Sequence, residues 1–302
     1  MLRRIGVVLG FVLATMVWGD AASYAATCST TYDASVLSDS PWAYYKTTES
    51  SGTTLADATG NGRDMTTSGG PTLAQSGPGV PSDGVSFPAS TTTEYYASTS
   101  ATYTGSTVTI EAWVYLTALP TANTPIVARG VAYGTGGVDK YLYVTTAGKV
   151  AMYLFNGGQI TVTTSSPLTL NAWHLIDASV GTDTHIRVDK ATGATLANTG
   201  SSTSAGKWFI HGGGVDGTST NQIDATNGSA VKIARVAIYP GQISDARADA
   251  HYDAVGCATV TSGGGSASSA LTDDDRAMFT AGFGLLVLLS AANLVSNWGR
   301  DS

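Results

Sequence analysis

Between residues 30 and 257 the chain consists of short runs in which apolar and polar side chains alternate. A period of two is typical of a β-strand with one buried face. The alternating runs are residues 106–116, 139–155, 172–180, 184–196 and 231–239, separated by turn signals at 147–149, 181–183 and 192–193. The sequence therefore predicts an all-β antiparallel β-sandwich of many strands, in which only residues 244–254 form a helix.

The two ends of the chain have the composition of export and membrane segments. Residues 1–25 contain Arg3 and Arg4, an apolar stretch and then small residues, which predicts a secretory signal peptide. The alternative is an uncleaved N-terminal anchor. Residues 277–295 form a run of 19 residues without charge, enough to cross the roughly 30 Å hydrocarbon core of a bilayer. We expect a single transmembrane helix over 277–298; the alternative is a buried core helix.

These segments predict the organisation of the whole chain. A signal peptide at 1–25 precedes a β-sandwich domain at 28–257, a Gly/Ser-rich linker at 258–275, the membrane helix and a short cytoplasmic tail at 299–302. The domain is then exported and held at the inner or cytoplasmic membrane. Because the tail is so short, we expect the function to face outward.

Charge and cysteine content narrow the possible partners. The net charge is −7, so the surface repels phosphate backbones and we expect no nucleic acid partner. Cys28 and Cys257 are the two cysteines of the chain, one near each end of the domain. In an exported protein such a pair predicts a disulfide; the alternative is two free buried thiols.

Four segments, in order, carry a family resemblance. They are "WAYYKTTESSGTTLADATGNG" (42–62), "VTIEAWVYL" (108–116), "PLTLNAWHLIDASVGTDTHIRVDKATG" (167–193) and "IARVAIYPGQISDARADAHYDA" (233–254). Together they resemble the laminin-G-like, concanavalin A-like jelly-roll family of surface proteins. The resemblance implies a jelly roll that binds a surface glycan or a protein receptor, and in some members a Ca²⁺ ion.

The resemblance also implies where calcium would bind. Asp57 and Asn61 match the family turn that contributes to such a site, whereas Ala234 and Arg235 replace the Asp-Glu pair of its closing strand. The alternative is an Asx turn that only shapes the loop.

Aromatic side chains are the candidates for a ligand face, because sugars stack on flat rings. Four of them adjoin Gly-, Ser- and Thr-rich loops, namely Tyr95, Tyr96, Tyr133 and Trp208. Tyr95 and Tyr96 are adjacent and cannot both face inward on a strand, so we expect at least one to be exposed. Three tryptophans on alternating strands are expected to fill the space between the sheets: Trp42, Trp113 and Trp173.

The sequence offers no catalytic constellation. Retaining glycoside hydrolysis needs two neighbouring carboxylates, yet the strand residues that follow Glu111 are Ala112, Trp113 and Val114. We assign no catalytic residue and expect Glu111 and the single His174 to be structural. A glycan-degrading jelly-roll enzyme is the least favoured class.

Two functions fit this layout. The first is a membrane-anchored, non-catalytic recognition module that acts as a lectin-like or protein-binding adhesin. The alternative is the receptor-binding minor coat protein of a filamentous phage, because the order of signal, domain, linker and span resembles that of tip adsorption proteins. In that case the partners include phage coat proteins and the final location is the virion tip.

Overall fold

The computed structural model describes residues 31–78, 82–88, 95–130, 138–155, 158–197, 205–211 and 230–255. The predicted signal peptide, linker, membrane helix and tail lie outside these residues, as do Cys28, Cys257 and Tyr133, so these assignments stay predictions. Within the described ranges, no helix has both the length and the apolar character needed to span a bilayer.

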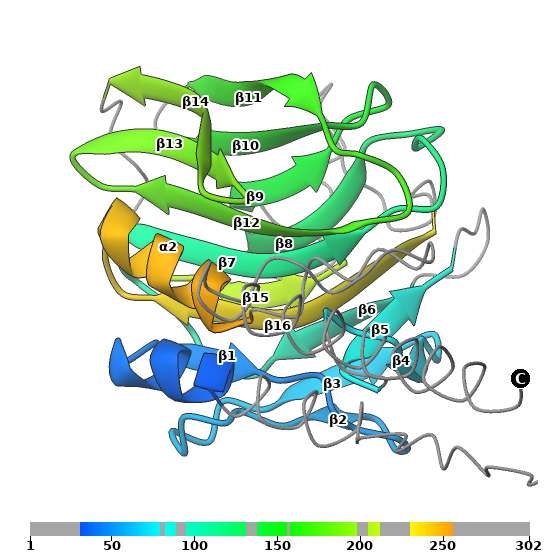
Figure 1. The fold of residues 1–302 in the computed structure, drawn as a ribbon. Coiled ribbons are helices and arrows are strands. Elements are labelled where there is room, and N and C mark those ends of the chain that lie inside the picture. Colours follow the sequence, from blue (N-terminus) through cyan, green and yellow to red (C-terminus); the bar gives the residue numbers. More distant parts are fainter. Residues whose placement is uncertain are drawn as a thin grey trace, which may run out of the picture.

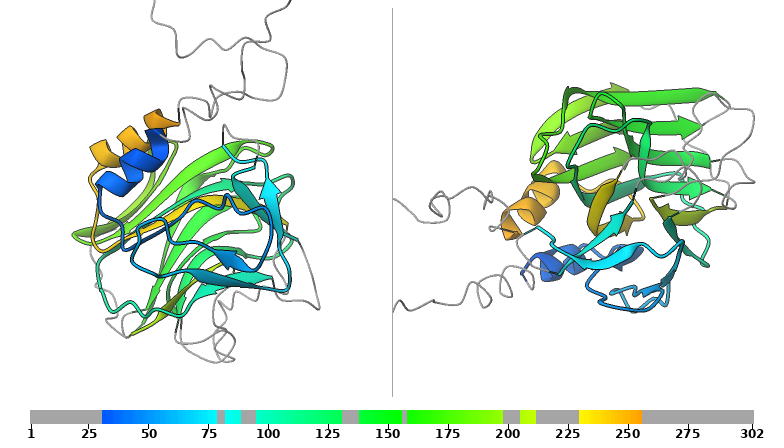
Figure 2. Two further views of the ribbon diagram at one scale, coloured as in Figure 1. Left: turned by 90° about the horizontal axis from the view of Figure 1, so that it is seen from below. Right: turned by 90° about the vertical axis from the view of Figure 1, so that its right-hand side faces the viewer.

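Two antiparallel sheets lie face to face (Figures 1 and 2). In the described residues the first sheet has the order β14 (Ala191–Ala197), β13 (Asp183–Val188), β12 (Trp173–Val180), β7 (Val108–Tyr115), β16 (Val231–Tyr239), β5 (Gly84–Phe87) and β4 (Thr72–Gln75), with β1 (Ala43–Tyr45) also paired to β16. The second has the order β11 (Gln159–Pro167), β10 (Lys149–Phe155), β9 (Val138–Val144), β8 (Thr124–Gly130), β15 (Lys207–Ile210), β6 (Tyr96–Thr99), β3 (Met65–Ser68) and β2 (Thr54–Leu55). The predicted all-β antiparallel sandwich is confirmed.

The main core lies between the sheets and follows the period of two. On β7 the inward residues Val108, Ile110, Ala112 and Val114 are all buried in this core. Successive strand residues point to opposite faces, so Trp113 faces outward from the sandwich. It belongs to a second apolar cluster, and it is fully buried there.

This second cluster corrects the prediction for the tryptophans. Trp42 packs against the core between the sheets, as expected. Trp113 and Trp173 instead lie in the second cluster on the outer face of the first sheet, so placing them between the sheets was wrong. A period of two separates the two faces of a strand, but when both faces are covered it does not say which one meets the other sheet.

Two helices cover that outer face. Residues 31–38 are helical, and α2 (Asp245–Ala254) lies beside them, as both views of Figure 2 show. The predicted helix at 244–254 is confirmed, with the Ser244 side chain capping its start by accepting a hydrogen bond from the Arg247 N–H. The helix at 31–38 was missed because a segment of two turns carries almost no periodic signal.

The hairpin that follows β12 turns at a different place than expected. Asp189 and Lys190 have positive φ values of 49° and 73° and form the two-residue turn between β13 and β14. The predicted turn at 192–193 lies within β14. Asp189 is held at the turn because its carboxylate contacts His174 Nδ1 at 2.5 Å and accepts a bond from the Leu175 N–H at 2.9 Å. His174 is thus structural, as predicted.

A buried polar group joins both helices to the first sheet. Glu111 projects from β7, and its carboxylate accepts hydrogen bonds from the Tyr32 hydroxyl at 2.5 Å and from His251 Nδ1 at 2.7 Å. His251 Nε2 lies 3.0 Å from a carboxylate oxygen of Asp39, beyond the first helix. Asp177 stands opposite Glu111 on β12. Glu111 therefore links residue 32, α2 and two strands, which confirms a structural role.

The ends of the described domain also meet in the second cluster. Tyr32 and Val255 are both buried in it. Cys28 and Cys257 themselves lie outside the described residues, so the disulfide between them stays a prediction.

Asp177 and His251, two of the titratable groups that face Glu111, hold protons more tightly in the folded chain. Burial, and then the charge of Glu111, raise the pKa of Asp177 well above its ordinary value. Burial lowers the pKa of His251, but the hydrogen bond and charge of Glu111 outweigh it and raise the net value. A raised folded pKa means that the stabilising contribution is complete at pH below the unfolded pKa and is lost as the pH rises through the folded pKa.

The Asp177→Asn substitution tests this linkage. The amide cannot ionise and can donate a hydrogen bond to Glu111. The variant therefore keeps at high pH the stability that the wild type loses when Asp177 ionises. We expect equal stability near pH 4 and a variant that is more stable by about 1–2 kcal/mol at pH 8. Thermal unfolding followed by circular dichroism from pH 4 to pH 8 measures the difference. Asp253→Asn, an exposed change on α2, is the control, and an equal pH trend in both variants would contradict the assignment.

Candidate functional site

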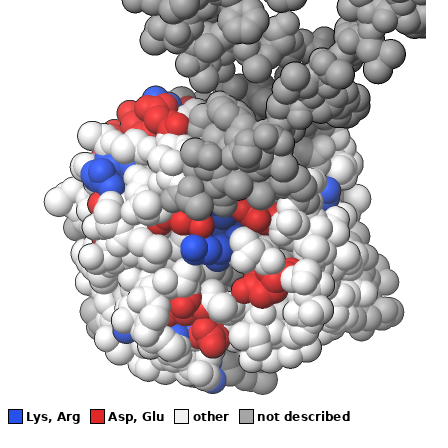
Figure 3. All heavy atoms as spheres, turned by 60° about the horizontal axis from the view of Figure 1, so that its bottom comes forward, with Lys and Arg blue, Asp and Glu red and all other residues white. Residues whose placement is uncertain are grey.

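The visible charge of the domain is dispersed. Among the described residues in the view of Figure 3, acidic and basic side chains form small mixed groups, with no continuous patch of one sign. Phosphate backbones are bound by clustered Lys and Arg. This face offers no such cluster, in keeping with the net charge of −7.

An open pocket of about 380 Å³ lies where the β13–β14 hairpin meets the loop before α2. All but one of its lining residues are polar or charged. They consist of Thr182, Asp183, His185, Thr192, Thr195, Gln242, Ile243, Ser244 and Asp245. Ile243 is the one apolar side chain among these lining residues. A pocket of this composition offers hydrogen bonds rather than an apolar surface.

Strand alternation places the functional groups of the hairpin on one face. Asp183 and His185 are two residues apart on β13 and point to the outer side of the first sheet. Thr195 of β14 pairs with His185, and Thr192 pairs with Arg187 in the same ladder. The pocket floor is therefore a small patch of two neighbouring strands.

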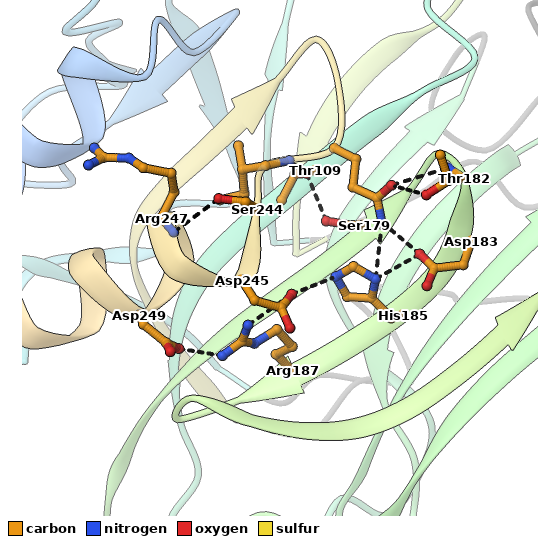
Figure 4. A network of polar contacts seen from close by, with 12 residues as sticks. Thr109, Ser179, Thr182, Asp183, His185, Arg187, Ser244, Asp245, Arg247 and Asp249 are labelled. Atoms are coloured by element: carbon orange, nitrogen blue, oxygen red, sulfur yellow. Dashed lines mark hydrogen bonds and ion pairs between the residues drawn. The ribbon is translucent and has the colours of Figure 1, made fainter.

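A network of hydrogen bonds fixes the polar groups (Figure 4). Gln242 Oε1 accepts bonds from the Thr182 N–H at 3.1 Å and the Thr182 hydroxyl at 2.9 Å, while Gln242 Nε2 donates to Asp183 Oδ1 at 2.6 Å. His185 lies between two carboxylates, with Nδ1 2.9 Å from Asp183 and Nε2 3.8 Å from Asp245. The hydrogen bond from His185 is the main cause that lowers the pKa of Asp183, so Asp183 is a carboxylate at neutral pH.

Hydroxyl groups of the sheet hold the loop that carries Gln242. The Thr109 hydroxyl on β7 contacts the Ser179 hydroxyl at 2.8 Å and donates to the Gly241 carbonyl at 2.9 Å. The same oxygen accepts a bond from the Ile243 N–H at 3.0 Å. The loop is thus anchored on both sides of Gln242 to the two central strands.

Ion pairs rather than apolar burial hold α2 against the hairpin. Three aspartates four residues apart, Asp245, Asp249 and Asp253, lie along one side of α2. The Arg187 guanidinium lies 2.9 Å from Asp245 and bonds to Asp249, and Lys190 Nζ lies 2.6 Å from Asp253. The helix itself buries only Ala248 and His251. The pocket wall therefore depends on charge.

The aromatic residues proposed from the sequence do not line this pocket. Trp208 is 0% exposed and packs between the sheets, 5.6 Å from the ring of Tyr103, so its predicted exposure was wrong. It lies on the inward face of β15, as the alternation of that strand requires. Tyr95 packs against the main core, whereas Tyr96 faces outward against Phe209; both are half-buried. They stay candidates, as does Tyr133 outside the described residues.

The carboxylate of the predicted calcium turn is engaged by its own loop. The Asp57 carboxylate already accepts bonds from the backbone N–H groups of Tyr44, Thr59 and Arg63, and from the Thr59 hydroxyl. The Asn61 side chain donates toward the Trp42 carbonyl. These contacts are those of an Asx turn, the alternative weighed above.

The second half of the calcium site differs even more from the family pattern. At the closing strand, the Arg235 guanidinium occupies the place of a carboxylate and donates to Asp83 at 2.6 Å. Across the described ranges no three His, Cys, Asp or Glu side chains gather as metal ligands would.

Part of the pocket could have been inferred from the sequence. His185 lies on the strand predicted at 184–196, whereas Asp183 belongs to the turn predicted at 181–183. The structure begins β13 at Asp183 and so places both side chains on one strand face. Gln242 and Asp245 lie about sixty residues later. Only the docking of α2 on the sheet brings them to the hairpin.

Comparisons with known proteins agree with this architecture. A laminin-G-type family model, described as the concanavalin A-like lectin/glucanases superfamily, matches residues 90–248. A search of curated protein sequences finds no match.

Three solved structures illustrate the likeness in fold. The botulinum neurotoxin serotype D binding domain has a TM-score of 0.53 at 12% identity, covering 74% of this chain and 52% of that one. The binding domain of botulinum neurotoxin DC in complex with SialylT has a TM-score of 0.52 at 11% identity, covering 72% of this chain and 52% of that one. A Trypanosoma rangeli sialidase in complex with 2,3-difluorosialic acid has a TM-score of 0.53 at 11% identity, covering 76% of this chain and 38% of that one. The chain spans about half or less of these proteins, and at such identities the likeness concerns the fold alone.

Calcium binding at Asp57 remains an untested prediction, and a thermal shift measurement decides it. The Asp57 carboxylate is occupied by its own loop, so we expect millimolar Ca²⁺ to leave the melting temperature unchanged. A rise in melting temperature with Ca²⁺ that is absent in Asp57→Asn would show that the loop rearranges to bind the ion.

The pocket floor is tested by the Gly181→Ala substitution. An added Cβ would lie 2.6 Å from Gln242 Oε1 and 2.9 Å from Gln242 Cβ, so Gln242 must move away from Thr182. We expect a loss of about 1–3 kcal/mol in unfolding free energy and faster amide hydrogen exchange in the peptide containing Thr182. Gly158→Ala is the matched control, because its Cβ meets no atom within 4 Å. Equal effects of the two substitutions would contradict the close packing of Gln242.

Proposed function

The chain belongs to the concanavalin A-like lectin/glucanase superfamily, and from this premise we propose that it is an exported carbohydrate-binding module. The ligand site of this proposal is the pocket between the β13–β14 hairpin and the start of α2. The domain is held at a membrane by the segment 277–298 and faces away from the cytoplasm. It acts in adhesion, by binding and without catalysis.

The observation that carries the proposal is the polar, prearranged lining of the pocket. A sugar presents many hydroxyl groups, each able to donate and to accept a hydrogen bond. Carboxylate, amide, imidazole and threonine hydroxyl groups complement them, and here Gln242 and Asp183 are already fixed by their neighbours. The volume of about 380 Å³ lies in the range of small-molecule sites, roughly 300–1,000 Å³.

The solved structures support the class of ligand. One neurotoxin structure concerns interaction with two ganglioside molecules, another contains SialylT, and the sialidase contains a sialic acid derivative. A further neurotoxin binding domain is in complex with rat synaptotagmin II. The same fold therefore supports glycan ligands in some proteins and a protein receptor in another. The pocket composition makes a glycan the better proposal for this chain.

Burial argues against hydrolysis at Glu111. The fold does supply the second carboxylate that the strand sequence lacks, because Asp177 pairs with Glu111 across β12 and β7. However, Glu111 is 0% and Asp177 4% exposed, and the Tyr32 hydroxyl and His251 occupy the Glu111 oxygens. A substrate would have to displace both helices to reach this pair.

The open pocket is also poorly suited to acid catalysis. Retaining hydrolysis needs one carboxyl group that stays protonated at working pH. The pKa of Asp183 is lowered, mainly by its hydrogen bond to His185, which is the direction opposite to that of a general acid. These features support binding rather than turnover.

The place of the membrane segment follows from the predicted layout. The described domain ends at Val255, beside the buried Tyr32, and the Gly/Ser-rich residues 258–275 follow. A flexible tether of this kind lets a binding domain reorient toward a glycan surface. The phage adsorption protein remains an alternative on the sequence layout, with coat proteins as further partners.

A glycan array tests the proposal directly. The full-length chain is kept in a detergent without a sugar headgroup, which would otherwise compete for the pocket. We expect binding to a defined set of glycans, weakened roughly tenfold by Gln242→Ala, because a hydrogen-bonding group is lost. Gln75→Ala, on β4 at the far end of the same sheet, is the matched control and should bind like the wild type.

The array result can also contradict the proposal. A folded wild-type protein that binds no glycan would make a protein receptor the favoured ligand. Binding that is unaffected by Gln242→Ala would place the glycan elsewhere on the domain.

A further inference from the structure

The charged groups of the pocket are unequally accessible. The side chains of Asp183 and Asp245 are 36% and 63% exposed, whereas those of His185 and Arg187 are 11% and 4% exposed. The two carboxylates are thus open to solvent, whereas the basic side chains are largely buried. Figure 4 shows Asp183, His185, Asp245 and Arg187 joined in this order by ion pairs.

The cation behind the pocket is already engaged. Arg187 contacts both Asp245 and Asp249, and it donates a hydrogen bond to the Lys190 carbonyl at 2.8 Å. Asp245 and Asp249 share this one guanidinium, whereas Asp183 contacts His185 instead. Three carboxylates and one guanidinium give these four residues, Asp183, Asp245, Asp249 and Arg187, a formal charge of −2.

His185 is largely covered by its neighbours. Its Nδ1 lies 2.9 Å from Asp183 Oδ1 and 3.1 Å from Gln242 Nε2. Nε2 is directed toward Asp245 at 3.8 Å, beyond hydrogen-bond distance. The exposed charged groups of the rim are therefore the carboxylates of Asp183 and Asp245, which accept hydrogen bonds.

From this geometry, and resting on the proposed function, we infer that the pocket selects neutral and amine-bearing sugars and rejects acidic ones. An ammonium group of an amino sugar complements Asp183 and Asp245 and donates to the acceptors of the rim. The carboxylate of a uronic or sialic acid meets like charge and finds no free cation among the described pocket residues. The ligand class therefore differs from the sialic acid derivative bound by the structurally similar sialidase.

The magnitude follows from the exposure of the carboxylates. Exposed ion pairs are worth about 0.2–1 kcal/mol, a factor of roughly 1.5 to 5 in affinity, and salt screens them. We expect affinity to fall about threefold from amino sugar to neutral sugar, and about threefold again from neutral to acidic sugar. Both differences in affinity should become smaller when the salt concentration is raised from 20 to 300 mM.

Matched probes measure this order. Multivalent conjugates of glucose, glucosamine and glucuronic acid, and of the corresponding galactose series, are offered to the full-length chain at pH 7. Asp183→Asn and Asp245→Asn should each reduce the preference for amines and improve binding of the acidic sugars. Asp64→Asn removes the same charge from an exposed position before β3, in the other sheet, and it should leave the order unchanged. Thermal unfolding shows whether each variant is folded. If one of the two pocket variants does not fold, the other is sufficient to test the charge selection.

The outcomes separate the inference from the proposed function. Acidic sugars that bind as tightly as neutral ones, with Gln242→Ala still weakening both, would overturn the charge selection and leave the glycan site in place. An equal effect of Asp64→Asn and Asp245→Asn would also overturn it, since the preference would then reflect net charge. Absence of binding to every sugar, and to every glycan on the array, would overturn the proposed function itself.

Discussion

The hydrogen-bonded carboxylate of Glu111 is the interaction on which the rest of this domain depends. A buried charge without partners costs several kcal/mol, and each Glu111 oxygen accepts a hydrogen bond from outside the sheet, one from the Tyr32 hydroxyl and one from His251. The segment at 31–38 and α2 must therefore dock together on the first sheet. Their docking covers Trp113 and creates the second apolar cluster.

The candidate pocket is a consequence of that docking. Once α2 lies on the sheet, its acidic side meets Arg187 and Lys190 of the hairpin, and the loop before it is fastened to Thr109. The remaining space at the start of α2 is lined by polar groups whose positions are set by one another. A site built in this way is polar and negatively charged for structural reasons, and this limits which ligands it can accept.

Sequence patterns predicted the sandwich, its strands near 106–116 and 231–239, the helix at 244–254 and the structural role of His174. They failed where both faces of a strand are buried, so that Trp113 and Trp173 were assigned to the wrong layer. They also failed for Trp208, since proximity to a Gly- and Ser-rich loop says little about where a strand residue points. The carboxylate pair of Glu111 and Asp177 was invisible because it forms across strands that are far apart in sequence.

The sequence by itself determined the all-β class and the division of each strand into two faces, because side chains alternate along a strand whatever surrounds it. Only the tertiary structure decided which face meets the other sheet and which meets the helices. It alone placed Gln242 and Asp245 beside the hairpin, because that contact depends on a helix held by ion pairs to residues about sixty positions away.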